Sequence, residues 1–233
     1  MKHDPSLFHP QPIKGFHSKN VFFIPADSAS GIIRKHIQSI ALRHLTTPFG
    51  QLFRIPSGTV LYQCIGAPPA VLNLERLIAS GAKDILILGF CGALSSDANI
   101  GDCIVTTKAI ADEGTSVHYL PDREGFSPSS SLQRHTEAYL KSLRIQFRHG
   151  VVISTDAPFR ETESWLDRSR LRGAGFVDME ASALFALAEF HGIRAAALLI
   201  VSDILTSGNH LLGFRSVKLS HQIKRCFLPF LTP

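Results

Sequence analysis

Apolar residues along this chain recur with two alternating periods, one typical of strands and one typical of helices. Val21–Ile24 and Ile85–Leu88 are short, continuous apolar runs, which is the pattern of strands covered on both faces. Between them, residues 68–81 follow Pro68 and Pro69 with apolar side chains at helical spacing and end at Gly81. Strands that alternate with helices in this way predict an α/β fold with a mostly parallel sheet.

The same two patterns extend to the rest of the chain. Further strands are expected at 51–55, 59–65, 103–106, 150–154 and 195–202. Helices are expected from Ser28 or Ser30 to Leu45, and at 130–143, 161–172, 180–191 and 213–227. No repeat or low-complexity linker divides these elements. We therefore predict one domain over residues 1–233, with an irregular N-terminal arm over residues 1–20.

Composition and hydropathy narrow the class of protein. Hydrophobic residues make up 45% of the 233 residues and charged residues 18%, which excludes a disordered chain. The first twenty residues contain no apolar core of a secretory signal. The longest apolar run is far shorter than the roughly 18 residues that a membrane-spanning helix needs. A cytoplasmic, globular protein without a membrane partner is the prediction.

Charged and metal-binding residue types do not point to nucleic acid or to a metal. The formal net charge is +5, but Lys and Arg are dispersed, with mild clusters at 168–172 and 218–225 that we interpret as solvated helix faces. The four cysteines contain no CxxC pair and the eleven histidines no HExxH motif. We predict no metal, no cofactor and a reducing compartment.

Three segments with chemically active residues follow strands of the predicted sheet. These are Gly89–Leu94, Val177–Ala183 and Val201–Asp203. Ligands of open parallel sheets bind beyond the carboxyl ends of the strands. The spacing therefore predicts one cleft that holds two or three carboxylates together with backbone amides exposed by glycine.

These segments, with two others, carry a resemblance to a known family. The motifs are Gly-Phe-Cys-Gly-Ala-Leu at 89–94, Gly-Asp at 101–102, Glu-Gly-Thr-Ser at 113–116, Val-Asp-Met-Glu-Ala-Ser at 177–182 and Ser-Asp at 202–203. In order and spacing they resemble the purine nucleoside phosphorylase / uridine phosphorylase family, which includes the methylthioadenosine and adenosylhomocysteine nucleosidases. The resemblance extends from Val21 to Phe227. It implies a three-layer αβα fold, phosphorylase/hydrolase-like, with a central mixed, mostly parallel sheet.

The resemblance also implies a reaction and roles for residues. Members of the family cleave the N-glycosidic bond between ribose and a nucleobase. By position, Glu180 would accept hydrogen bonds from ribose hydroxyls, with Met179 against the sugar. Asp203 would be the catalytic acid or hydrogen-bond partner at a purine ring nitrogen, and Arg215 would pair with it. The alternatives are a helix N-terminal charge for Glu180 and a surface charge for Arg215.

For the nucleobase, the resemblance implies contacts with Phe159 and Ser202. Phe159 lies where the family places side chains that contact the base, and an aromatic ring can stack on it. The alternative is an aromatic core residue. The segment around Phe159 matches neither the purine nor the pyrimidine class, so the base stays open.

The main departure from the family concerns phosphate. Phosphorolytic members have Gly-Asp-Pro-x-Arg after the first strand, where this chain has Pro-Ala-Asp-Ser-Ala-Ser at 25–30. Ile87 replaces a family arginine, and Phe90 replaces a Ser or Thr. The remaining phosphate candidates are Ser28 and Ser30, at a helix start, and Arg54, which resembles an arginine that reaches a neighbouring subunit's phosphate.

Three functional hypotheses follow. The first is phosphorolysis, which gives free base and ribose 1-phosphate with inorganic phosphate as co-substrate, as in purine salvage. The second is hydrolysis, because the phosphate-binding arginines are replaced. The third is nucleoside binding without turnover, which retention of both Glu180 and Asp203 disfavours. Relatives form dimers, trimers or hexamers, so the resemblance implies a homo-oligomer.

Overall fold

The computed structural model describes residues 6–28 and 30–232. Part of the predicted N-terminal arm, residues 1–5, lies outside the described residues, as do Ala29 and Pro233. Strands have these bounds: β1 Asn20–Ile24, β2 Arg43–Thr47, β3 Gly50–Ile55, β4 Gly58–Tyr62, β5 Asp84–Ala93, β6 Cys103–Asp112, β7 Gly125–Phe126, β8 Arg148–Thr155, β9 Phe176–Asp178, β10 Arg194–Thr206 and β11 Asn209–Leu212.

Helices connect some of these strands, and two more follow the last strand. Their bounds are α1 Ile32–Ile40, α2 Ala67–Ala79, α3 Ser130–Ser142, α4 Glu163–Leu171, α5 Ala181–Phe190, α6 Val217–Cys226 and α7 Leu228–Leu231, with 3₁₀ turns η1 Ser116–His118 and η2 Pro158–Arg160. In the described part of the chain, none of them is long and apolar enough to cross a membrane.

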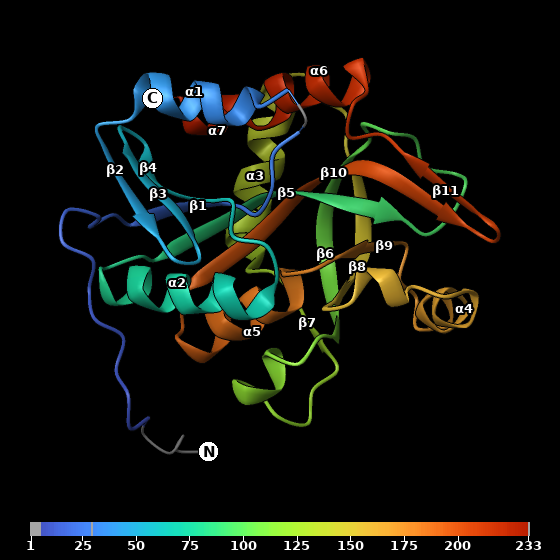
Figure 1. The fold of residues 1–233 in the computed structure, drawn as a ribbon, viewed down its shortest axis with the longest axis horizontal. Helices are drawn as coiled ribbons and strands as arrows, with labels where there is room; N and C mark the ends of the chain where they lie inside the picture. Colours follow the sequence, from blue (N-terminus) through green and yellow to red (C-terminus); the bar gives the residue numbers. More distant parts are fainter. Residues whose placement is uncertain (1–5, 29, 233) are drawn as a thin grey trace.

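The elements form three layers, with the sheet in the middle (Figure 1). Helices α2 and α5 cover one face, and α1, α3, α6 and α7 cover the other. Each face has its own cluster of buried side chains: Leu74 and Leu184 belong to the first, Ile37 and Ile223 to the second. This confirms the predicted αβα arrangement.

The sheet is mixed. Its strand order is β11-β10-β6-β8-β9-β5-β1-β4-β3-β2, with β7 on β6 and a second pairing between β10 and β5. β4, β1, β5 and β10 are parallel neighbours, whereas the β2–β3–β4 meander and the β10–β11 hairpin are antiparallel. Because β10 pairs with both β5 and β6, the strands β5, β10, β6, β8 and β9 form a closed ring.

Two predicted helix boundaries are wrong. α1 ends at Ile40 instead of Leu45, since residues 43–47 pair with β3 as strand β2, and the residue before α1 is Gly31 rather than a capping serine. The last long helix begins at Val217 instead of Gly213. Its cap is Ser216, whose hydroxyl accepts a hydrogen bond from Leu219 N (3.0 Å), because residues 209–212 are used as strand β11.

The described part of the predicted arm has no helix or strand before Asn20. It is nevertheless packed against the domain: Ile13 and Phe16 are buried in the cluster beneath α2, and Ile13 N donates to Ser80 Oγ (2.8 Å). The arm is therefore irregular and anchored.

Candidate active site

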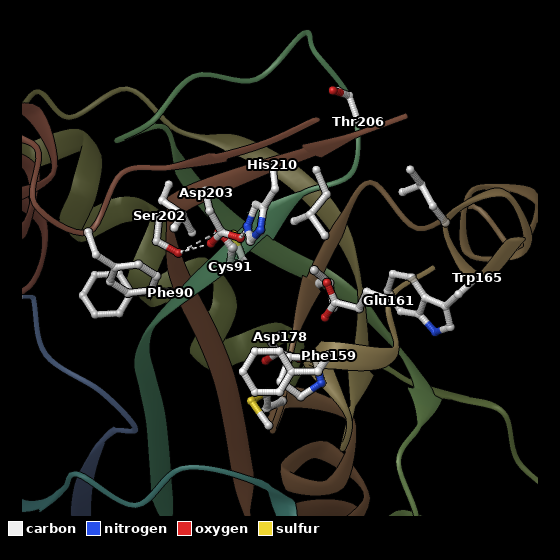
Figure 2. A pocket seen from close by; sticks show the side chains of 18 of the residues that line it. Phe90, Cys91, Phe159, Glu161, Trp165, Asp178, Ser202, Asp203, Thr206 and His210 are labelled. Atoms are coloured by element: carbon white, nitrogen blue, oxygen red, sulfur yellow. Dashed lines mark hydrogen bonds and ion pairs between the residues drawn. The ribbon is translucent and has the colours of Figure 1, made fainter. Parts of the chain in front are cut away.

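A cavity of about 560 Å³ opens at the carboxyl ends of the central strands (Figure 2). Its walls come from the ends of β5, β9 and β10, from β11, and from the segment that leads into α4. The three segments expected to share a cleft all contribute: Phe90–Gly92, Val177–Glu180 and Ser202–Asp203. The prediction of one shared cleft is therefore confirmed.

Glu180 lies at the start of α5 and is buried, with 6% of its surface exposed. Its Oε1 accepts a hydrogen bond of 2.6 Å from Gly66 N. Gly66 has φ +92°, a conformation that L side chains rarely adopt, so glycine is required where this amide meets the carboxylate. Burial, and then the negative charge of Asp178, raise the pKa of Glu180 to about 8.

Asp178 holds the start of α5 through hydrogen bonds. It accepts hydrogen bonds from Ser154 Oγ (2.5 Å) and Ala181 N (2.9 Å). Burial raises the pKa of Asp178 to about 6. This increase is smaller than that of Glu180, because the two donors favour the ionised form of Asp178. Of the two neighbouring acids, Asp178 is therefore the one that holds a negative charge at neutral pH.

Asp203 reaches the cavity through an irregularity in β10. The register with β5 shifts between Val201 and Asp203, so Ser202 is an extra residue in the ladder. Such a bulge redirects side chains, and here consecutive residues, Ser202 and Asp203, both line the cavity. A Cβ at Gly92 would lie 3.1 Å from Asp203 Oδ2, so β5 must carry glycine beneath this carboxylate.

Ser202 orients that carboxylate. Its hydroxyl donates to Asp203 Oδ1 (2.6 Å) and lies 3.3 Å from the carbonyl oxygen of Cys91. The side chain is 1% exposed. The expected contact of Ser202 with the base stays a prediction.

Two cavity residues were missed by sequence reasoning. His210, on β11, places Nε2 2.9 Å from Asp203 Oδ2. Glu161 points into the cavity from the segment after η2 (Figure 2). Burial, and then the charge of Asp203, raise the pKa of Glu161 to about 7, while His210 opposes this shift. Neither residue belongs to a motif, and β11 was itself not expected.

Phe159 and Met179 lie in the cavity wall as predicted. Phe159 is fully exposed, which contradicts its alternative role as a core residue and leaves its ring free to stack on a ligand. Met179 is partly buried between Asp178 and Glu180.

The other four predicted site residues do not line this cavity. Ser28 and Ser30 bond to each other (2.8 Å), and Asp27 accepts from Ser28 N (2.7 Å). Arg54 donates to the carbonyl oxygens of Ile55 (2.8 Å) and Gly58 (2.5 Å), and so closes its own hairpin. Arg215 is exposed in the turn before α6. Their roles stay predictions, and Arg215 is not paired with Asp203 in this structure.

Ile87 and Phe90, which replace polar residues of the family, also lie in apolar surroundings. Ile87 is buried under α2 and α5. Phe90 points to the opposite face, where its ring packs against Phe214 and Phe227, with centroids 5.8 and 5.9 Å away. An anion that approached the end of β5 would meet an aromatic wall.

The loop with the Glu-Gly-Thr-Ser motif at 113–116 has a structural role in this chain. Glu113 is buried, accepts hydrogen bonds from Thr115 N (2.5 Å) and Ser116 N (3.0 Å), and does not line the cavity. Ser182 of the α5 motif donates to its other oxygen (3.0 Å). The loop therefore fixes the start of α5, which carries Glu180.

The cavity wall is acidic. The described residues that line it include no Lys or Arg and five carboxylates: Glu161, Glu163, Asp178, Glu180 and Asp203. Across the described chain, no three His, Cys, Asp or Glu side chains gather in a way that could hold a metal ion. The arrangement suits a neutral ligand that donates hydrogen bonds.

Comparison with protein families and curated sequences gives consistent matches. The family model described as the phosphorylase superfamily matches residues 43–224. A guanosine phosphorylase from Halorubrum lacusprofundi is 32% identical over 155 residues, which are 65% of this chain and 64% of that protein. A DeoD-type purine nucleoside phosphorylase from Shewanella oneidensis is 33% identical over 63% of each chain. These alignments cover slightly less than two thirds of the relatives' length.

Solved structures match over more of the chain. A purine nucleoside phosphorylase from Toxoplasma gondii, in complex with immucillin-H, has a TM-score of 0.82 with 22% identity and covers 99% of this chain and 96% of its own. An AMP nucleosidase from Bacteroides thetaiotaomicron has a TM-score of 0.72 with 22% identity, covering 89% and 86%. At this identity the likeness establishes the fold.

Proposed function

This chain belongs to the phosphorylase superfamily, and we propose that it cleaves the N-glycosidic bond of a purine nucleoside. One observation carries the proposal: Glu180 at the start of α5 and Asp203 near the end of β10 share one cavity with the exposed ring of Phe159. A ribose holder, an acid and a stacking surface are the groups that this bond cleavage needs. The names of the curated relatives support the same substrate class.

The ribose end of the substrate would lie at Glu180 and Met179. The 2′- and 3′-hydroxyls are donors. Because hydrogen bonds to the charged form of an acid favour that form, binding of the ribose would lower the raised pKa of Glu180 and promote its ionisation. Burial makes these hydrogen bonds stronger than they would be in water. Gly66 N already occupies one lone pair of Glu180, which fixes the direction of the remaining ones.

The base would lie at Asp203 and Phe159. Cleavage through an oxocarbenium-like transition state leaves negative charge on the base, and a proton at a purine ring nitrogen neutralises it. The side chain of Asp203 is mostly buried, is held by Ser202 and His210, and faces the cavity. It is the group that would deliver this proton.

For the nucleophile, the geometry favours water over phosphate. A phosphate anion needs compensating positive charge, and the described cavity wall offers five carboxylates and no Lys or Arg. Ile87 and Phe90 are apolar where relatives of the family carry phosphate-binding groups. The hydrolytic mode gives free base and ribose.

Phosphorolysis is the second candidate, because both curated relatives are named phosphorylases. It would require a cation from outside the described cavity wall. Arg54, on β3, is the candidate that a second copy of the chain would contribute.

Product analysis distinguishes the two modes. Inosine, guanosine and adenosine are incubated with the protein in ¹⁸O-labelled water, with and without inorganic phosphate. We expect base release that is indifferent to phosphate, with ¹⁸O in the ribose. Release only with phosphate, with ribose 1-phosphate as product, would establish phosphorolysis. Absence of base release from every nucleoside would refute the proposed function.

A homo-oligomer is also proposed, with the cavity mouth near the contact. Apolar side chains at the mouth are exposed: Ile65 by 58%, Phe159 by 100% and Leu212 by 68%. Patches of this kind commonly mark interfaces. Light scattering of the purified protein tests this, and a monomer at working concentration would contradict it.

A further inference from the structure

We propose that His210 is the proton source for Asp203: the two residues hold one proton between them and deliver it to the departing purine. This inference rests on the proposed function, because it assigns a role within that reaction. His210 would thus take the place expected for Arg215, and unlike an arginine it can give up its proton.

The position of His210 follows from the β10–β11 hairpin. Leu205 pairs with His210, and Asp203 pairs with Leu212, in an antiparallel register. Side chains two residues apart on a strand share a face, so Asp203 and His210 are diagonal neighbours across the ladder. Such neighbours are within reach of a long side chain, and the 2.9 Å contact between His210 Nε2 and Asp203 Oδ2 results.

The tip of this hairpin is anchored, which fixes the register. Thr206 and Asn209 form the last pair, so the loop has two residues, Ser207 and Gly208. Gly208 has φ +71°, the left-handed conformation that glycine adopts without strain. Its N–H donates to Glu163 Oε1 of α4 (2.6 Å). The hairpin is therefore tied to the helix that forms the opposite wall of the cavity.

Two contacts, one at each oxygen, hold the carboxylate of Asp203. Ser202 Oγ donates to Oδ1 at 2.6 Å, and His210 Nε2 lies at Oδ2. With a protonated imidazole both contacts are donor-to-acceptor, and the carboxylate is ionised. His210 has 51% of its side chain exposed against 16% for Asp203, so the imidazole can exchange protons with solvent while Asp203 faces the substrate.

In the cleavage step, the C1′–N9 bond breaks and its electron pair stays on the base. N7 of the base takes a proton from Asp203, which takes one from the imidazolium of His210. A water oxygen bonds to C1′ and releases its proton to solvent, and solvent returns a proton to His210. No oxidant, metal or further reactant is required.

Other ionisable groups face the pair from the packed elements. Glu161 comes from the segment after η2, Glu163 from α4, and Asp178 and Glu180 from the β9–α5 junction. All four carry or can carry negative charge. Glu161, whose pKa is raised to about 7, also ionises near neutral pH and needs its own control.

The test uses a leaving group that needs no proton. In 7-methylguanosine, N7 already carries a methyl group and the base is cationic. His210→Gln keeps a hydrogen-bond donor near the Nε2 position but cannot supply a proton. We expect it to lower kcat for guanosine by about a hundredfold and kcat for 7-methylguanosine by less than about threefold. His221→Gln, at an exposed histidine of α6 outside the cavity, should change neither rate.

The pH profile of guanosine cleavage is the second readout. We expect kcat of the wild-type protein to fall at alkaline pH. This fall should persist in Glu161→Gln and should disappear in His210→Gln. Equal losses on both substrates, or an unchanged profile in His210→Gln, would overturn the inference while leaving the proposed function intact. A wild-type protein that cleaves neither substrate would overturn both.

Discussion

At the scale of single residues, the site depends on carboxyl groups whose ionisation the fold controls. Glu180 and Asp178 are separated by one residue, yet their pKa values are raised to different extents, to about 8 and about 6. The difference comes from hydrogen bonding, since Asp178 accepts from the Ser154 hydroxyl in addition to the backbone N–H groups of Glu180 and Ala181. A protonated Glu180 and an ionised Asp178 therefore coexist at neutral pH.

We predict that Glu180→Gln stabilises the fold at alkaline pH while abolishing ribose binding. The pKa of Glu180 is about 8 in the folded chain against an ordinary value of 4.5, so the folded state binds more protons in this range. The free energy of unfolding of the wild type should therefore fall as the pH rises from about 4.5 to about 8. Glutamine cannot ionise, so at pH 8 the free energy of unfolding of the variant should exceed that of the wild type by about 4 kcal/mol.

Thermal or denaturant unfolding across pH measures this effect. The dependence below about pH 6 should remain in the variant, because Asp178 still titrates there. Glu124→Gln, at a side chain that is 90% exposed, is the matched control and should leave the profile unchanged. A Glu180→Gln profile parallel to that of the wild type would contradict the assignment.

Asp203→Asn should lower kcat for a purine nucleoside by about two to four orders of magnitude, because asparagine keeps the shape of the side chain but cannot transfer a proton. Steady-state base release measures this. Asp167→Asn, on the exposed side of α4, serves as the control. A near-normal rate in Asp203→Asn would disprove the role of the carboxylate.

Sequence reasoning identified residues at this scale where motifs carried them. Glu180, Met179, Asp203, Phe159 and Ser202 all line the cavity, as predicted. His210 and Glu161 could not be found in this way, because the first depends on cross-strand register and the second on a turn of irregular chain. Proximity of this kind is a property of the folded backbone and leaves no local pattern.

At the scale of elements, the ends of β5 and β10 decide the geometry. The bulge at Ser202 brings two consecutive side chains to one cavity, and Gly92 leaves room for Asp203 above β5. The strands themselves were predictable from their apolar runs. The bulge was not, since nothing in Val-Ser-Asp distinguishes an irregular ladder from a regular one.

We predict that Gly92→Ala impairs catalysis more than folding. The new Cβ would lie 2.7 Å from Leu205 Cδ1 and 3.1 Å from Asp203 Oδ2, so both side chains must move. We expect kcat to fall at least tenfold, with a loss of about 1–3 kcal/mol in the free energy of unfolding. Gly175→Ala, where a Cβ meets nothing within 4 Å, is the control for kinetics and unfolding. Unchanged kcat in Gly92→Ala would show that the strand and Asp203 are not closely coupled.

The helix boundaries that were wrong share one cause. Residues 43–47 and 209–212 were assigned to helices or left unassigned, and both form antiparallel strands on the outer parts of the sheet. Their exposed side chains give them no apolar alternation. Strands of this kind are determined by their partners, so only tertiary structure identifies them.

At the scale of the whole molecule, net charge and local charge have opposite signs. The chain carries +5, but the cavity wall is acidic. Several arginines are committed to surface ion pairs, including Arg148 with Asp97 (2.7 Å) and Arg194 with Asp84 (2.5 Å). The net charge of the chain therefore does not indicate the kind of ligand. The groups that line the cavity do.

This separation predicts selection against phosphorylated substrates. Inosine 5′-monophosphate would bring a dianion beside five carboxylates, and we expect its kcat/KM to be at least a hundredfold below that of inosine, or about 2.7 kcal/mol of transition-state stabilisation. Competition between the two in one assay measures the ratio. Raising the salt concentration should narrow it, whereas the rate for inosine alone should hardly change. Equal rates for the two would refute the neutral-ligand proposal.

The two-residue loop at Ser207 and Gly208 has a consequence for how this protein can diverge. Because side chains alternate between faces, inserting one residue in the hairpin would turn His210 away from Asp203 and bring a neighbour into its place. Gain or loss of a single codon here would separate His210 from Asp203, and would therefore affect proton delivery more than most point substitutions would. Among descendants of this chain, we expect length to be kept in this hairpin even where its sequence drifts.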